Sequence, residues 1–145
     1  MAGIGPLKKA ILDTDIFSEI IKGVDQTVAA NASAYRTAFN RYTISAVTFM
    51  EVIRGYQQKQ ASHQLQTFLT GIVTEEVIPF DHPAAEVAGK IAGELKRVGR
   101  PIGVSDPMIA AIAITHGLDL VTGNTMHFQQ VQQLGYPLTL VNWRI

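Results

Sequence analysis

Residues 10–15 read Ala10-Ile11-Leu12-Asp13-Thr14-Asp15, three apolar residues followed directly by three polar ones. A short apolar run that stops at polar residues is typical of a β-strand buried on both faces, with the polar residues at its carboxyl end. Strands of this kind occur in parallel sheets, whose two faces are covered by helices. The run therefore predicts the first strand of an α/β fold.

The rest of the chain alternates between strand-like and helix-like patterns. Short β-rich runs predict four more strands, at Tyr42–Ser45, Val77–Phe80, Leu118–Val121 and Leu138–Val141, and Pro79 limits the second of these to an edge or an end of the sheet. Apolar residues three or four apart predict helices at Ile16–Ile21, Asp25–Phe39, Ala46–Gln57, Ala61–Ile72, Pro83–Gly99 and Pro107–Ile114, and from about Thr125. We therefore expect residues 1–145 to form a single three-layer α/β domain, with a mainly parallel sheet flanked by helices.

One of the expected helices is apolar on every side. Residues Met108–Ile114 contain no polar side chain, which predicts a helix enclosed by protein all round. Gly117 is well placed to end this helix in the left-handed conformation.

The composition excludes several classes of function. The chain has 12 Lys and Arg residues against 12 Asp and Glu residues, so nucleic-acid binding would have to come from a local site. It contains no cysteine, which removes disulfides, thiolate metal ligands and cysteine nucleophiles and is compatible with a reducing cytoplasm. No window approaches the ~20 apolar residues of a membrane span, and Met1–Lys9 lacks the apolar stretch of a leader, so we expect a soluble, unprocessed cytoplasmic protein.

Three acidic residues stand out because each adjoins strongly apolar sequence, where a charge is costly unless it is compensated: Asp13, Glu51 and Asp106. Asp13 ends a predicted strand, Glu51 lies on a helix that follows one, and Asp106 begins the apolar helix. One edge of the sheet could therefore bring all three together. Grouped carboxylates repel each other, and a bound cation is the simplest compensation; oxygen ligands suit Mg²⁺ or Mn²⁺.

Each of these acids also has a purely structural interpretation. Asp106 precedes Pro107 and could cap a helix. Asp13 could be a turn residue after its strand, and Glu51 a solvated helix residue. Only the three acidic residues taken together indicate a metal site.

Four segments, taken in order, resemble the PIN-domain nucleases and, within them, the VapC toxins of bacterial toxin–antitoxin pairs. They are Ile11–Asp15, Ser45–Gly55, Ile102–Ala111 and Gly117–Phe128, and the resemblance runs from about Ala10 to Val141. It implies that Asp13, Glu51 and Asp106 bind the metal and that Thr14 and Thr122 are supporting hydroxyls. Many PIN domains have an aspartate where this chain has Asn124, so we expect one firmly held metal and leave a second open.

The resemblance implies a Mg²⁺-dependent endoribonuclease, with Mn²⁺ as a possible substitute, that leaves products bearing a 5′-phosphate. In this interpretation Asp13 and Asp106 bind the metal directly, Glu51 acts on a ligand water, and Asn124 forms hydrogen bonds to that water or to the phosphate. The implied partners are an RNA substrate and a small antitoxin protein, and the implied assembly is a homodimer.

Basic residues suggest how RNA could be held, although each has a second interpretation. Lys96, Arg97 and Arg100 could bind RNA phosphates, or they could be the solvated end of a helix whose negative terminus favours cations. Arg54 could contact a phosphate or form a helical ion pair with Glu51. The four histidines show no pairing that suggests a metal-free ribonuclease, and we expect His127, the nearest to the site, to be merely packed or solvated.

Two other functions compete with the nuclease interpretation. The Asp13-Thr14-Asp15 run resembles the nucleophile motif of haloacid-dehalogenase-type phosphatases, but that motif expects Thr at Phe17 and a later pair of acids that we do not find. A non-catalytic alternative is a PIN-fold binding partner whose apolar helices near Ile16–Ile21 and Ala46–Tyr56 receive a small antitoxin-like peptide.

Overall fold

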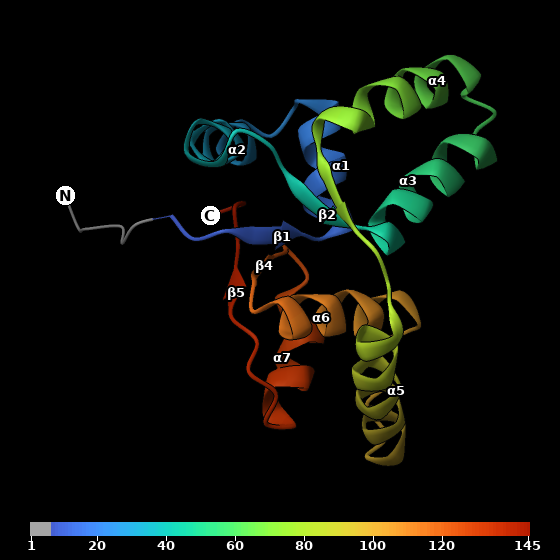
Figure 1. Ribbon diagram of the computed structural model, residues 1–145, viewed down its shortest axis with the longest axis vertical. Helices are drawn as coiled ribbons and strands as arrows, with labels where there is room; N and C mark the ends of the chain where they lie inside the picture. The colour runs from blue at the N-terminus through green and yellow to red at the C-terminus, as the bar shows by residue number, and fades with distance from the viewer. Residues whose placement is uncertain (1–6) are drawn as a thin grey trace.

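The fold is built on a five-stranded parallel sheet, which the computed structural model describes within residues 7–145 (Figure 1). Its order is β3-β2-β1-β4-β5, and the strands are β1 (Ala10–Leu12), β2 (Thr43–Ser45), β3 (Glu76–Ile78), β4 (Asp119–Val121) and β5 (Leu140–Val141). The last residue of β1 is in register with Ile44 and with Val121. Because all the strands are parallel, their carboxyl ends lie along one edge of the sheet.

Helices cover both faces of the sheet. Figure 1 shows α1 (Thr14–Lys22), α2 (Gln26–Phe39) and α4 (Ser62–Gly71) on one side, and α5 (His82–Arg97), α6 (Ser105–His116) and α7 (Thr125–Gln133) on the other. The remaining helix, α3 (Ala46–Gln58), follows β2 directly and packs against both α1 and α6. A short 3₁₀ turn at Ile72–Thr74 joins α4 to β3.

The two hydrophobic cores lie on opposite faces of the sheet because strand side chains alternate between faces. Ile11 packs with α5, α6 and α7, whereas its neighbours Ala10 and Leu12 pack with α1 and α2. The middle of α6, Ile109–Ala113, is completely buried. Burial of each large aliphatic side chain contributes roughly 1.5–3 kcal/mol, so the central strand and α6 hold the layers together.

The expected elements are confirmed, with shifts at their ends that have local causes. The first helix begins at Thr14 rather than Ile16, because the Asp13 side chain accepts a hydrogen bond from the Thr14 backbone and caps it. β3 lies at an edge of the sheet, as Pro79 requires, and Gly117 ends α6 with a φ of 63°. Residues 1–6, which carried part of the expectation of an unprocessed chain, lie outside the described residues. None of the helices in the described part of the chain has the length and apolar character needed to cross a bilayer.

Candidate metal centre

The predicted acidic residues lie either directly after a strand or in the first two turns of a helix, at the carboxyl end of the sheet. Asp13 stands between β1 and α1, and Glu51 is in the second turn of α3. Asp106 is in the first turn of α6, and Asn124 directly precedes α7. The parallel topology thus brings together side chains from four separate segments of the chain.

Asp13 is a buried carboxylate with an exposed fraction of only 5%. Its Oδ1 accepts a hydrogen bond from the Thr14 backbone at 2.8 Å, and its Oδ2 accepts one from the Thr122 hydroxyl at 2.7 Å. Burial raises the pKa of Asp13 to about 7; the charges of Asp15 and Asp106 add to this, and the hydrogen bonds from Thr122 and Thr14 oppose it. The ionised form of Asp13 is therefore destabilised in the folded protein, and a nearby cation would stabilise it.

Glu51 is held by a hydroxyl rather than left in solvent. Its Oε1 accepts a hydrogen bond from the Thr14 hydroxyl at 2.5 Å, and that hydroxyl also lies 2.9 Å from the hydroxyl of Thr48. The Glu51 side chain is 17% exposed, so the interpretation as a freely solvated helix residue is wrong. Arg54, one turn along α3, places its guanidinium 3.6 Å from Glu51, which is the helical ion pair considered above.

Asp106 does not cap α6. The helix begins at Ser105, and within the described chain its N-cap residue Val104 forms no side-chain capping bond. The Asp106 Oδ2 instead lies 2.8 Å from Nδ1 of His127 and accepts a 3.4 Å hydrogen bond from the Asn124 amide. Burial raises the pKa of Asp106, the hydrogen bond and charge of His127 lower it, and the charges of Glu51 and Asp15 raise it.

His127 was expected to be merely packed or solvated, and that expectation is wrong. The side chain is 48% exposed, yet its Nδ1 contacts both Asp106 and the Asn124 amide, at 2.8 Å each. His127 is in the first turn of α7, which begins directly after Asn124, and its contact with Asp106 depends on how α7 packs beside α6.

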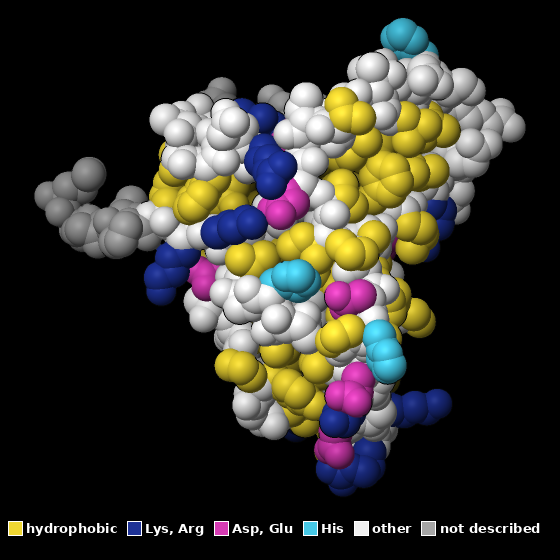
Figure 2. All heavy atoms as spheres, viewed as in Figure 1, with side chains coloured by type: hydrophobic (Ala, Val, Ile, Leu, Met, Phe, Trp, Pro, Cys, Tyr) yellow, Lys and Arg dark blue, Asp and Glu magenta, His cyan; other side chains and the backbone are white. Residues whose placement is uncertain are grey.

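Within residues 7–145, the structure does not bring the predicted RNA-binding residues Lys96, Arg97 and Arg100 to the carboxylates. Arg97 pairs with Glu94, and Arg100 contacts Gln130 and Gln133 near the end of α7. Asn124 lies at the opposite end of that helix, about 9 Å or more away along its axis. Lys96 shares the end of α5 with Arg97, and Figure 2 shows basic side chains gathered at the lower tip, where this helix ends in Figure 1.

The donor chemistry of the site fits a hard divalent cation, although the side chains are not closed around one point. Within residues 7–145, no three acidic or histidine side chains converge tightly enough to form a ready ligand set. Thr122, Thr14 and His127 hold the three carboxylates separately, and like charges repel. The available donors are oxygens from carboxylates, hydroxyls and an amide, which are the ligands that Mg²⁺ and Mn²⁺ prefer.

A stability measurement tests the part that Asp106 plays. Metal-free Asp106→Asn should stay folded and match or slightly exceed the melting temperature of the unaltered protein, because it removes a carboxylate whose pKa is raised by burial. Added Mg²⁺ should raise the melting temperature of this variant less than that of the unaltered protein. Asp119→Asn is the matched control, since Asp119 begins β4 at the opposite edge of the sheet. Equal Mg²⁺-induced shifts in all three proteins would show that Asp106 is not a ligand.

Comparisons with known proteins agree with this architecture. A family model described as the PIN domain matches residues 10–134. The tRNA(fMet)-specific endonuclease VapC of Shigella flexneri is 38% identical over 128 residues, which span 85% of this chain and 92% of that protein. A crystal structure of DNA-bound VapBC from Salmonella typhimurium aligns with a TM-score of 0.79 and 30% identity, over 94% of this chain and 99% of the other.

The fold and the acidic edge of the sheet define a nuclease of the PIN-domain class, whose members depend on divalent metal ions. Within that class, the chain belongs to the VapC family of ribonucleases. The phosphatase alternative loses its basis, because Phe17, where that motif expects a hydroxyl, is packed into the core with an exposed fraction of 4%.

Proposed function

We propose that this chain is the toxin of a toxin–antitoxin pair, an endoribonuclease that uses Mg²⁺, or Mn²⁺ in its place, to hydrolyse RNA phosphodiester bonds. The observation that carries the proposal is the placement of three carboxylates, Asp13, Glu51 and Asp106, at one edge of the sheet, with Asp13 buried to an exposed fraction of 5%. Burying an ionised carboxylate destabilises the folded protein, so binding a cation explains a carboxylate in these surroundings better than a structural role does.

Each residue of the site has its own role, which follows from its position. When bound, Mg²⁺ supplies neutralising charge to the phosphate and lowers the pKa of water. Asp13 and Asp106 would hold it directly, and Glu51, fixed by the Thr14 hydroxyl, would orient the attacking water. Asn124 would direct its amide at a phosphate oxygen in place of Asp106. Thr122 keeps Asp13 aimed at the site through its hydrogen bond.

The substrate class follows from the relatives rather than from a groove of basic residues. The Shigella and Salmonella relatives are named for tRNA(fMet) cleavage, and we propose a structured RNA of the same class, cut in an unpaired loop in the cytoplasm. Arg54, which pairs with Glu51, could contact a flanking phosphate.

The proposal is tested by incubating the purified protein with total RNA in Mg²⁺, in EDTA, and in EDTA followed by excess Mg²⁺. We expect cleavage in the first and third reactions and none in the second. Sequencing the 5′ ends of the fragments should show 5′-phosphates at a small set of positions. Equal cleavage with and without EDTA would refute the metal-dependent mechanism.

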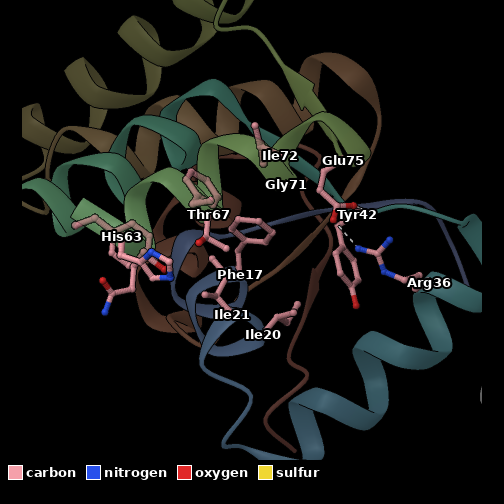
Figure 3. Close-up of a pocket in the computed structure, with 13 residues that line it drawn as sticks. Phe17, Ile20, Ile21, Arg36, Tyr42, His63, Thr67, Gly71, Ile72 and Glu75 are labelled. Carbon is pink, nitrogen blue, oxygen red and sulfur yellow. Dashed lines mark hydrogen bonds and ion pairs between the residues drawn. The ribbon is translucent and has the colours of Figure 1, made fainter. Parts of the chain in front are cut away.

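The antitoxin, we propose, binds an apolar cavity of about 530 Å³ between α1, α3 and α4 (Figure 3). Phe17, Ile20 and Phe68 line it, and at one end Arg36 pairs with Glu75 while lying 4.2 Å from the Tyr42 ring centroid. The helices expected to receive a peptide, near Ile16–Ile21 and Ala46–Tyr56, both contribute to this lining. The structural relatives include VapBC complexes, which supports an antitoxin segment as the occupant.

A charge placed in this cavity should separate antitoxin binding from catalysis. Ile21 lines the cavity and is 41% exposed, so Ile21→Asp should fold normally and weaken binding of the co-expressed cognate antitoxin about thirtyfold or more, while RNA cleavage continues. Isothermal titration calorimetry measures the affinity. Val24→Asp is the matched control, because Val24 is 77% exposed but does not line the cavity. Equal affinities for both variants would place the antitoxin elsewhere.

A further inference from the structure

Beyond the residues discussed so far, the C-terminal segment brings one cation to the acidic side of α1. The Arg144 guanidinium lies 3.2 Å from Glu19, 3.6 Å from Asp25 and 4.0 Å from Asp15. Two of these acids belong to α1, and the third caps α2. Asp15 is two residues from Asp13, so Arg144 reaches the edge of the candidate metal centre from the last turn of the chain.

The position of Arg144 is set by the core and not by its surface contacts alone. The preceding residue, Trp143, has an exposed fraction of 5%, and its ring centroid lies 5.6 Å from that of Tyr35. The Trp143 carbonyl accepts a hydrogen bond from the Asn31 amide at 3.0 Å, and the Arg144 backbone donates to the Asn142 side chain at 2.9 Å. The segment after β5 is thus anchored to α2, and this anchoring fixes the position of the Arg144 side chain.

Asp15 connects Arg144 to the turn that carries two site residues. Its Oδ2 accepts a hydrogen bond from the Gly123 backbone at 3.0 Å and faces Nε of Arg144. Gly123 stands between Thr122 and Asn124, which contact Asp13 and Asp106 respectively. The Asp15 carboxylate therefore ties α1 to the turn after β4.

A side chain at position 123 would come too close to the side chains of Asp15 and Arg144. A Cβ atom there would lie 2.7 Å from Oδ2 of Asp15 and 2.8 Å from Nε of Arg144. Its backbone is not among the glycines with positive φ in the described chain, so conformation does not demand glycine here. A side chain at position 123 would therefore have to displace the Asp15 carboxylate or the Arg144 guanidinium from its place.

We propose that Arg144 is a positioning residue of the metal centre. It holds Asp15 against the Gly123 amide and thereby keeps Thr122 and Asn124 beside the carboxylates they contact. In this arrangement Asp15 is a structural anion paired with Arg144, and it is not a metal ligand. The inference rests on the proposed function only in treating those carboxylates as the catalytic site.

The first test is hydrogen exchange of the Gly123 amide in metal-free protein, followed by NMR. Arg144→Ala should speed this exchange about fivefold, because it removes the cation that faces the Asp15 carboxylate across 4.0 Å, and Arg144→Lys should show a smaller increase because it keeps a cation. Arg41→Ala is the matched control, since it removes a surface cation paired with Glu76 at the other edge of the sheet, and it should leave the exchange unchanged. Unchanged exchange in Arg144→Ala would overturn the proposal. If the alanine variant does not fold, the lysine variant decides by the same criterion.

A second test asks whether Arg144 acts through Asp15. Asp15→Asn keeps an acceptor for the Gly123 amide but removes the charge that Arg144 holds. In the Asp15→Asn background Arg144→Ala should change the exchange by less than about twofold, whereas an equal change of about fivefold in both backgrounds would overturn the proposed route. In cleavage assays Arg144→Ala should lower kcat with little change in KM. The exchange results stand even if the unaltered protein cuts no RNA, so failure of this inference and failure of the proposed function can be told apart.

Discussion

Replacing Asp13 with asparagine should reduce RNA cleavage by at least about a hundredfold while the protein stays folded. Asparagine keeps an acceptor for the Thr14 backbone, so α1 retains its cap. It removes the one negative charge that is buried at the centre of the site, and with it the strongest interaction available to a cation. Initial rates on a defined RNA, compared at saturating Mg²⁺, measure the loss.

The matched control for this substitution is Asp119→Asn, which removes a carboxylate from the opposite end of the adjacent strand, where it is in register with Ala10. This variant should cleave RNA at the rate of the unaltered protein. Cleavage by Asp13→Asn within a few-fold of the control would contradict the assignment of Asp13. Formation of a covalent phosphoryl group on Asp13, detected by mass spectrometry, would instead revive the phosphatase alternative.

Metal-free protein should lose stability as the pH rises from about 4 to about 8. Asp13 has a pKa of about 7 in the folded protein against 3.8 for an ordinary aspartate, because burial opposes its ionisation. Between these values the folded state keeps a proton that the unfolded state has released, so rising pH favours unfolding. The loss from this group is at most about 4 kcal/mol and is complete above the folded pKa. Burial also raises the pKa of Asp106, which adds in the same direction.

Urea denaturation in EDTA at pH 5 and at pH 8 measures this change. Asp13→Asn should flatten most of the pH dependence and make metal-free protein more stable at pH 8, whereas Asp119→Asn should keep the original slope. Mg²⁺ added at pH 8 should restore stability to the unaltered protein and do little for Asp13→Asn. Equal stability at pH 5 and pH 8 in EDTA would show that ionisation of Asp13 does not destabilise the folded protein.

Much of the fold could be predicted because burial leaves a clear trace in the sequence. Strand β1 and the middle of helix α6 are enclosed by protein, and both appear as uninterrupted apolar runs. The gathering of Asp13, Glu51 and Asp106 at one edge also follows from a general rule, since parallel strands present their carboxyl ends together. What could be predicted was therefore set by periodicity and topology.

The finer contacts of the site depend on geometry that no local pattern encodes. His127 meets Asp106 across 21 positions because of the way α7 lies beside α6. Helix α6 starts at Ser105, two residues before the predicted start at Pro107, so Asp106 lies inside the helix and is a site residue rather than a cap. Arg144 reaches Asp15 only because Trp143 is buried against Tyr35. Each of these contacts needs the relative placement of two packed elements.

The hydrogen bond between Thr122 and Asp13 joins residues 109 positions apart. β1 pairs with β4 along its length, so Asp13 has its neighbours only after β4 and the Gly123 turn have been synthesised. A nascent chain that still holds this segment inside the ribosome carries an incomplete site. The acidic site is therefore complete only after the segment that ends at the Gly123 turn has been synthesised and has left the ribosome.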